Sequence, residues 1–307
     1  MRAIVNTPQG PGRIELHDGM VEPAPEPDQA LVAVAAVSIN RGELALLSSR
    51  PAGWQPGQDI AGTVLAAATD GSGPRAGSRV VGLVEGAGWA EQAAVRVRQL
   101  AELPEQVDTA SAATLPIAGR TALRTVALGG HLLGRRVLIT GAAGGVGRFQ
   151  VQLAALADAE VTAVTRRTDL RDDLLNLGAT SIVEQPANAD GLFDLVLDAV
   201  GGRQIGSAVA KVAPGGTVVL IGASDPEPAQ LSLLDFAGHE NAILRSYFSY
   251  AQPDTIDCDL ASLVRLLADH RLTPHIGLRS SWTDTNAALD AFAAGRVDGK
   301  AVLDVHA

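Results

Sequence analysis

Hydrophobic and polar positions change their spacing near Pro104, and this change divides the predicted elements into two groups. Before Pro104, short apolar runs alternate with turns rich in glycine and proline, such as residues 70–74. This spacing is typical of strands joined by tight turns, so we expect a compact, β-rich, barrel-like module. The predicted strands cover residues 2–6, 13–17, 30–39, 59–68, 79–84 and 89–95, with one or two helical turns over 41–48.

After Pro104 the apolar positions first follow helical spacing. Asp108 or Thr109 can cap a helix that runs through Ala112, and a second helix over 118–128 ends at two glycines. From residue 136 strands and helices alternate, which predicts a parallel sheet covered on both faces. The strands of this sheet are expected at 136–140, 160–165, 180–183, 193–198, 217–222 and 242–249.

The remaining segment is too short to form a domain of its own. It predicts a helix over 258–270, a strand near Ile276, a helix over 284–294 and a last strand over 300–305. We expect this segment to return to the N-terminal module and to complete its sheet.

The stretch 137–147 joins a short apolar strand to a helix through a glycine-rich turn, Gly141-Ala-Ala-Gly-Gly-Val-Gly147. Val146, Phe149, Leu153 and Leu156 then recur at helical spacing. A helix that begins after such a turn presents free N–H groups and the positive end of its dipole, where a pyrophosphate can bind. The alternative is that the glycines merely allow the helix and strand to pack closely.

Composition excludes several classes of function. The 307 residues suit two domains, and a net charge of -10 without a lysine-rich block argues against nucleic acid or an anionic membrane as partner. A single cysteine, Cys258, excludes disulfide scaffolds and thiolate zinc clusters within the chain. Neither a signal peptide nor an apolar run of membrane-spanning length is visible, so we expect a soluble cytoplasmic protein.

An ordered set of short segments spans nearly the whole chain. These segments are 38–44, 56–64, 88–92, 115–123, the glycine loop, 193–201, 215–222 and 299–303. Taken together the set resembles the medium-chain dehydrogenase/reductase superfamily, on its zinc-independent, quinone oxidoreductase-like branch. The resemblance implies a GroES-like catalytic domain over 1–112 and 261–307, a Rossmann domain over 113–260, and an active site in the cleft between them. It also implies a homodimer that acts on a small molecule.

Zinc can be tested position by position against that resemblance. Zinc-dependent relatives place ligands at the positions of Asn40, Glu43, Gln58 and near Ile117. Because the thiolate and imidazole ligands are replaced here, and tetrahedral zinc needs three or four converging donors, we expect no metal. Glu43 and Asp59 could instead hold a substrate or a loop, or pair with a nearby arginine.

The choice of cofactor is predicted at the end of the second strand of the parallel sheet. Thr165, Arg166 and Arg167 stand where an acid would bind the ribose of NAD, and arginine there accommodates the 2′-phosphate of NADP. Guanidinium groups match phosphate well, so we expect NADPH, with two solvated surface arginines as the alternative. Asp169 is expected to cap the next helix.

The resemblance also implies which residues surround the cofactor. Besides Thr165, Arg166 and Arg167, the expected cofactor-binding residues are Asn40, Thr121, Gly144, Gly145, Val146, Val200, Ile221, Gly222, Ala223, Tyr247, Phe248 and Lys300. Two interpretations of Asn40 stay open, since it could face the nicotinamide and substrate or simply cap a turn. Thr121 could equally be an ordinary helix residue.

These residues predict hydride transfer to an acceptor that can spread the incoming charge. Quinones and α,β-unsaturated carbonyls do so without zinc, and hydrogen-bond donors such as Asn40 and Arg41 could stabilise the oxygen that becomes negative. We expect Asn40 and Tyr247 to be catalytic, although solvent could supply the proton. Arg41, Trp54 and Tyr250 are expected to contact substrate, with an ordinary surface side chain as the alternative for Arg41. The alternatives are a redox-neutral or cyclising biosynthetic enzyme and a non-catalytic NADPH-binding regulatory protein.

Overall fold

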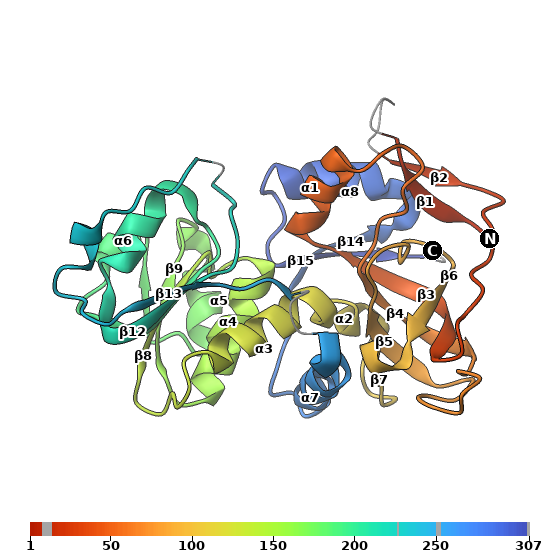
Figure 1. The fold of residues 1–307 in the computed structure, drawn as a ribbon, viewed down its shortest axis with the longest axis horizontal. Coiled ribbons are helices and arrows are strands. Elements are labelled where there is room, and N and C mark those ends of the chain that lie inside the picture. The colour runs from red at the N-terminus through yellow and green to blue at the C-terminus, as the bar shows by residue number, and fades with distance from the viewer. Residues whose placement is uncertain (8–13, 226, 250–252, 306–307) are drawn as a thin grey trace. The chain divides into compact units, whose positions relative to one another are not determined.

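The computed structural model describes residues 1–7, 14–225, 227–249 and 253–305, and they form two compact units (Figure 1). The first unit contains residues 1–120 and 252–307, and the second contains residues 121–251. The sequence placed the domain boundaries after residues 112 and 260, whereas the compact units change over after Arg120 and Ala251. The helix after residue 253 therefore lies in the first unit. Among the described residues, none of the helices is both long and apolar enough to cross a membrane.

The first unit is built on a mainly antiparallel seven-stranded sheet. Its strands follow the order β14 (Ile276–Ser281), β15 (Lys300–Asp304), β3 (Gln29–Ile39), β4 (Asp59–Ala66), β5 (Arg79–Leu83) and β7 (Leu100–Glu102), while β6 (Gln92–Arg96) also pairs with β3. β1 (Ala3–Asn6) and β2 (Ile14–His17) form a separate antiparallel pair. β15 pairs with β3 so that Ala301 faces Ile39, which confirms that the last segment returns to the N-terminal sheet.

Alternation explains why β3 forms where it does. Ala30, Val32 and Val34 are fully buried, and the residues that alternate with them, such as Leu31 and Ala33, are partly exposed, as expected for a strand with one face on a core. The core also contains Trp89 and Trp282, which are both buried. The helices of this unit are α1 (Arg41–Ser49), α2 (Thr109–Ala112), α7 (Ile256–Ala268) and α8 (Thr285–Ala293). Asp108 caps α2, because its carboxylate accepts the N–H of Ser111.

The second unit is a parallel six-stranded sheet. Its order is β10 (Ser181–Val183), β9 (Glu160–Val164), β8 (Arg136–Thr140), β11 (Phe193–Asp198), β12 (Val212–Leu220) and β13 (Ile243–Ser246). The helices are α3 (Arg120–Ala127), α4 (Gly145–Leu156), α5 (Arg171–Asn176) and α6 (Ile205–Val209). Figure 1 shows α6 on one side of this sheet and α3, α4 and α5 on the other. The order runs outward in both directions from β8 and β11, as in a doubly wound fold, which confirms the predicted α/β class.

Three expectations about elements of this region are wrong in detail. A π-helical turn over Leu115–Gly119 precedes α3, where the sequence predicted one continuous helix from residue 118. β12 begins at Val212, before its glycine pair, because its first residue pairs with Phe193. Leu156 is 39% exposed, so it does not share the buried face of α4 with Phe149.

Candidate functional site

The second unit gathers most of the predicted cofactor residues at one edge of its sheet. All six strands are parallel, so their carboxyl ends lie at the same edge. Gly144, Gly145 and Val146 follow β8, Thr165, Arg166 and Arg167 follow β9, Val200 follows β11, Ile221, Gly222 and Ala223 follow β12, and Tyr247 and Phe248 follow β13. β8 and β11 are neighbours at the point where the strand order reverses, which is where open α/β sheets bind ligands.

The glycine loop between β8 and α4 has the backbone geometry that a pyrophosphate site requires. Gly141 has a φ of 63°, which glycine adopts without strain. A Cβ on Gly147 would lie 2.4 Å from the Gly141 carbonyl oxygen, so α4 can pack this closely against the loop only with glycine there. Gly144 is exposed and lies immediately before α4. The N–H groups in the first turn of a helix have no hydrogen-bond partner within the helix. The loop geometry thus shows the close packing of α4 that the alternative expects, and phosphate binding at the exposed Gly144 stays a prediction.

A buried hydrogen-bond pair joins the ends of β8 and β11. Thr140 Oγ1 donates to Asp198 Oδ1 at 2.5 Å and accepts the N–H of Ala199 at 3.1 Å. Asp198 Oδ2 accepts the N–H of Gly201 at 2.8 Å. Burial raises the pKa of the Asp198 carboxyl above its ordinary value, against these hydrogen bonds. The pair fixes the loop after β11 beside the glycine loop.

Sequence reasoning did not select Asp198 as a site residue. The signal was present, since an acid closes an otherwise apolar run, Phe193-Asp-Leu-Val-Leu-Asp198. An acid at the buried end of such a strand needs a partner, and the threonine at the end of β8 supplies it.

The loops after β11 and β12 are packed against each other. Asp225 donates its N–H to the Val200 carbonyl at 3.0 Å, and Ile221 donates to the Asp198 carbonyl at 2.8 Å. A Cβ on Gly222 would lie 2.7 Å from the Ala199 oxygen. These contacts hold Val200 and Gly222, two of the predicted cofactor residues, next to each other.

The two arginines after β9 differ in their surroundings. The Arg167 guanidinium pairs with Asp169 at 2.6 Å, and both side chains are exposed. Asp169 does not cap α5, whose N-cap residue is Leu170, so that expectation is wrong. Arg166 is exposed and makes no hydrogen bond or ion pair with any residue that the structure describes. Thr165 is buried, and its hydroxyl accepts the N–H of Arg167.

Three further predicted residues belong to the second unit. Tyr247 is 9% exposed and donates its N–H to the Leu220 carbonyl, whereas Phe248 is 68% exposed. Thr121 is buried in α3, and its carbonyl accepts the hydroxyl of Thr125. Tyr250 lies outside the described residues, so its contact with substrate stays a prediction.

The first unit contains a fully buried polar cluster around Asp59. Its Oδ2 accepts hydrogen bonds from Ser38 Oγ at 2.5 Å and Asn40 Nδ2 at 2.7 Å, and its Oδ1 accepts the N–H of Ile117 at 2.9 Å. The Ile117 N–H comes from the π-helical turn, a feature often found at functional sites. Lys300 Nζ lies 3.4 Å from Asp59 Oδ2.

Glu43 lies at the edge of the same cluster. Its carboxylate accepts the N–H of Asn40 at 2.7 Å and that of Gln58 at 3.0 Å. Burial, and next the negative charge of Asp59, raise the pKa of Glu43 to about 8. The expectation that Glu43 or Asp59 pairs with an arginine is wrong for Asp59, because the cation beside it is Lys300.

Lys300 lies at the start of β15 and is 2% exposed. Its Nζ donates to Asn40 Oδ1 at 2.5 Å and to the Ile39 carbonyl at 3.0 Å, in addition to its contact with Asp59. Burial lowers the pKa of the Lys300 ammonium, and the negative charges of Asp59 and Glu43 oppose this shift. Contact between Lys300 and a cofactor stays a prediction.

The residues of this cluster do not fit a zinc ion. Zinc binds tetrahedrally through free sulfur, nitrogen or oxygen donors, but here the oxygens of Glu43 and Asp59 accept N–H and O–H groups and an ammonium lies among them. Across residues 1–7, 14–225, 227–249 and 253–305, no three His, Cys, Asp or Glu side chains converge as metal ligands would.

The two remaining residues predicted to contact substrate lie near α1. Arg41 is exposed, and its guanidinium lies 5.6 Å from the Phe292 ring centroid. Trp54 is partly buried against the core, and Arg50 lies 5.9 Å from its ring centroid. Both arginines are therefore in cation–π contact with aromatic rings of the first unit.

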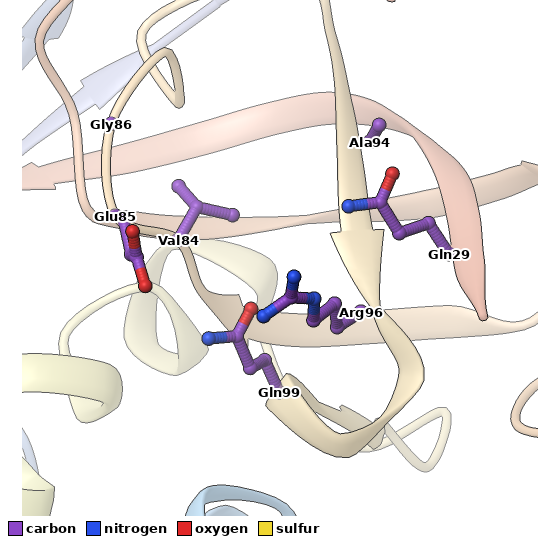
Figure 2. Close-up of a pocket in the computed structure, with 7 residues that line it drawn as sticks. All are labelled: Gln29, Val84, Glu85, Gly86, Ala94, Arg96 and Gln99. Carbon is purple, nitrogen blue, oxygen red and sulfur yellow. The ribbon is translucent and has the colours of Figure 1, made fainter. Parts of the chain in front are cut away.

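A polar depression of about 230 Å³ also opens on the first unit (Figure 2). Its lining residues are Gln29, Val84, Glu85, Gly86, Ala94, Arg96 and Gln99. It contains no residue predicted from the sequence to bind cofactor or substrate. The candidate residues therefore form two groups, one at the strand ends of the second unit and one around Asp59 in the first.

Two family models match the chain. The alcohol dehydrogenase GroES-like domain matches residues 26–105, and the zinc-binding dehydrogenase model matches residues 145–265. The first match covers strands of the antiparallel sheet, and the second covers most strands of the parallel sheet.

Curated relatives resemble part of the chain. Acrylyl-CoA reductase of Ruegeria pomeroyi is 36% identical over 186 residues, which cover 54% of this chain and 56% of the relative. The chloroplast envelope quinone oxidoreductase homolog of Arabidopsis thaliana is 30% identical over 201 residues, which cover 60% of this chain and 61% of the relative. The chain thus spans less than two-thirds of the length of these two relatives.

A solved structure resembles the whole chain. A mycobacterial protein complexed with NADPH matches with a TM-score of 0.89 and 22% identity, covering 99% of this chain and 100% of that one. At this identity the likeness shows the fold.

Proposed function

Because the chain belongs to the medium-chain dehydrogenase/reductase superfamily, on its quinone oxidoreductase-like branch, we propose that it is an NADPH-dependent oxidoreductase. It transfers a hydride, without a zinc ion, to a quinone or an α,β-unsaturated carbonyl compound. The observation that carries this proposal is the set of residues at the carboxyl ends of the parallel strands in the second unit.

In this proposal each strand end has its own part in binding the nucleotide. The first N–H groups of α4, behind the exposed Gly144, receive the pyrophosphate. Arg166 receives the 2′-phosphate, because its guanidinium is exposed and Arg167 is already paired with Asp169. Val200 and Gly222 line the cofactor beyond the pyrophosphate. The mycobacterial protein of the same fold, which is complexed with NADPH, supports this choice of cofactor.

The proposed class of acceptor follows from the fact that bound NADPH would supply a hydride. A conjugated acceptor moves the incoming charge onto a carbonyl oxygen, where hydrogen-bond donors stabilise it. Asn40 remains a candidate donor, since Asp59 accepts one of the two hydrogens on Asn40 Nδ2. The names of the relatives, an acrylyl-CoA reductase and a quinone oxidoreductase homolog, favour the same two acceptor classes. Tyr247 is the proposed proton donor, with solvent as the alternative.

The proposed assembly is a homodimer formed along β13. This strand is the last in the sheet, and no strand among the described residues pairs with its outer edge. All four of its residues are exposed. Ile243 is 53% exposed and Leu244 37% exposed, so the first half of this edge is apolar, whereas Arg245 and Ser246 are polar. Edge strands with such side chains readily pair with a second chain.

The purified protein, incubated with NADPH and a panel of quinones, enones and enoyl thioesters, tests the function. NADPH absorbance should fall only with an acceptor present, and the product should gain two hydrogens by mass. Binding of NADPH without consumption on any acceptor would favour a regulatory protein instead. A product of unchanged hydrogen content would favour a redox-neutral or cyclising enzyme. Failure to bind NADPH would overturn the proposal altogether.

A further inference from the structure

The ammonium group of Lys300 is enclosed by oxygen atoms inside the first unit. An ammonium carries three N–H donors and no acceptor. The Ile39 carbonyl, Asn40 Oδ1 and Asp59 Oδ2 lie 3.0, 2.5 and 3.4 Å from Nζ, which accounts for all three donors. The pairing of β15 with β3 brings this lysine to the cluster, because Ala301 faces Ile39 in the register.

This contact sets the direction of the Asn40 side chain. With Oδ1 on the ammonium, Nδ2 donates to Asp59 Oδ2 at 2.7 Å. Turning the amide over would place its NH₂ group against the ammonium and its oxygen against the carboxylate, so two attractive contacts would become repulsive. The charge on Lys300 therefore holds Asn40 in one orientation.

The same charge offsets a buried carboxylate. Asp59 is fully buried, and a buried ionised group is stable only when it is paired and hydrogen-bonded. Ser38 and Asn40 supply hydrogen bonds to Asp59, and Lys300 supplies the positive charge. By the family resemblance drawn from the sequence, Asn40 and Glu43 stand at positions where zinc-dependent relatives place ligands, and Ile117 lies near another such position.

We propose that the Lys300 ammonium is a built-in cation that takes the place of a metal ion in this cluster. It acts as a positioning residue for Asn40 and Asp59, and its charge and its three hydrogen bonds exclude a divalent ion. This inference rests on the proposed function and gives a structural reason why that function needs no zinc ion. Its readouts use neither NADPH nor an acceptor, so they are distinct from a failure to find activity.

The role of the charge is tested by removing the Lys300 side chain and adding a small molecule that can occupy the space it leaves. Lys300→Ala is expected to melt at a lower temperature than the wild type, and propylammonium should restore part of the loss because it matches the missing atoms. Propanol has nearly the same shape without the charge and should restore little. Lys300→Met fills the space, so it should respond to neither compound. Equal rescue by propanol, or no rescue by propylammonium, would overturn the role of the charge.

The orientation of Asn40 gives a second readout that a space-filling role would not change. The Asn40 side-chain amide, assigned by Asn40→Asp in ¹H–¹⁵N spectra, should be protected from solvent exchange in the wild type. It should lose that protection in Lys300→Met. Unchanged protection in Lys300→Met would show that Lys300 does not position Asn40, and this comparison does not need a folded Lys300→Ala.

The zinc content of the purified protein tests whether Lys300 keeps a divalent ion out of the Asp59 cluster. Wild-type protein exposed to Zn²⁺ and then dialysed against metal-free buffer should retain no stoichiometric zinc. Asp59→Asn is the matched control, because it changes the proposed pairing without changing side-chain size. One zinc per chain in the wild type that disappears in Asp59→Asn would place a metal in the cluster and overturn the proposal.

Discussion

Thr140 and Asp198 are joined at the buried ends of two neighbouring strands, with Thr140 Oγ1 donating to Asp198 Oδ1 at 2.5 Å. Thr140→Val keeps the branched shape but removes both the donor to Asp198 and the acceptor of the Ala199 N–H. A buried polar group left unsatisfied costs about 1–3 kcal/mol. We therefore expect the free energy of unfolding in urea to fall by about 2 kcal/mol, with weaker NADPH binding. Thr140→Ser keeps the hydroxyl, so its free energy of unfolding should fall much less. Equal falls in Thr140→Val and Thr140→Ser would contradict the role of this hydrogen bond.

Arg166 and Arg167 offer a matched pair for the choice of cofactor. Arg166→Ala should weaken NADPH binding about tenfold or more, because a hydrogen bond to a charged group is worth about 1.5–3 kcal/mol. NADH binding should change little, since NADH lacks the 2′-phosphate. Arg167→Ala should have a smaller effect, because Asp169 already pairs with Arg167. Titration of both nucleotides checks this, and equal losses for NADH and NADPH would remove Arg166 from the phosphate site.

The pH dependence of stability should report the buried Glu43 carboxyl. Its folded-state pKa of about 8 lies above the ordinary value of 4.5. Between these values the folded protein binds more protons than the unfolded chain, so the free energy of unfolding falls as the pH rises. Glu43→Gln cannot titrate and should flatten the curve over this range. Urea unfolding across pH checks the slope, with Glu85→Gln, at an exposed position, as the control that should leave it unchanged.

The exposed edge strand β13 predicts how the protein assembles. Leu244→Asp places a negative charge on this apolar edge and should convert a homodimer into a monomer in sedimentation equilibrium. Leu133→Asp is the control, because Leu133 is 60% exposed in the second unit but lies outside the edge strand. A dimer that persists in Leu244→Asp would place the interface elsewhere.

Local patterns were sufficient for much of the fold. The apolar run that ends at Thr140 and the glycines after it predicted β8, the loop and α4, because strand, turn and helix are each specified by nearby residues. The parallel sheet followed from alternation of elements, and the residues at its strand ends followed from the sheet. The return of the last strand to the first sheet was predicted because a segment so short cannot form a core alone.

The remaining features depend on contacts that no local pattern specifies. Lys300 is 241 residues from Asp59 in the sequence, so its partner could be found only from the register of β15 on β3. Asp169 was expected as a helix cap, but a guanidinium two residues away competes for its carboxylate and binds it. The buried state of Asp198 likewise depends on a threonine 58 residues earlier.

The position of β15 between β14 and β3 has a consequence for the order in which the chain folds during synthesis. Residues 121–251 emerge from the ribosome as one continuous segment, so the parallel sheet can be completed while translation continues. The antiparallel sheet must wait for residues 300–304, and until then the Asp59 carboxylate has no lysine beside it. The sheet of the first unit is therefore completed last, although most of its strands are synthesised first.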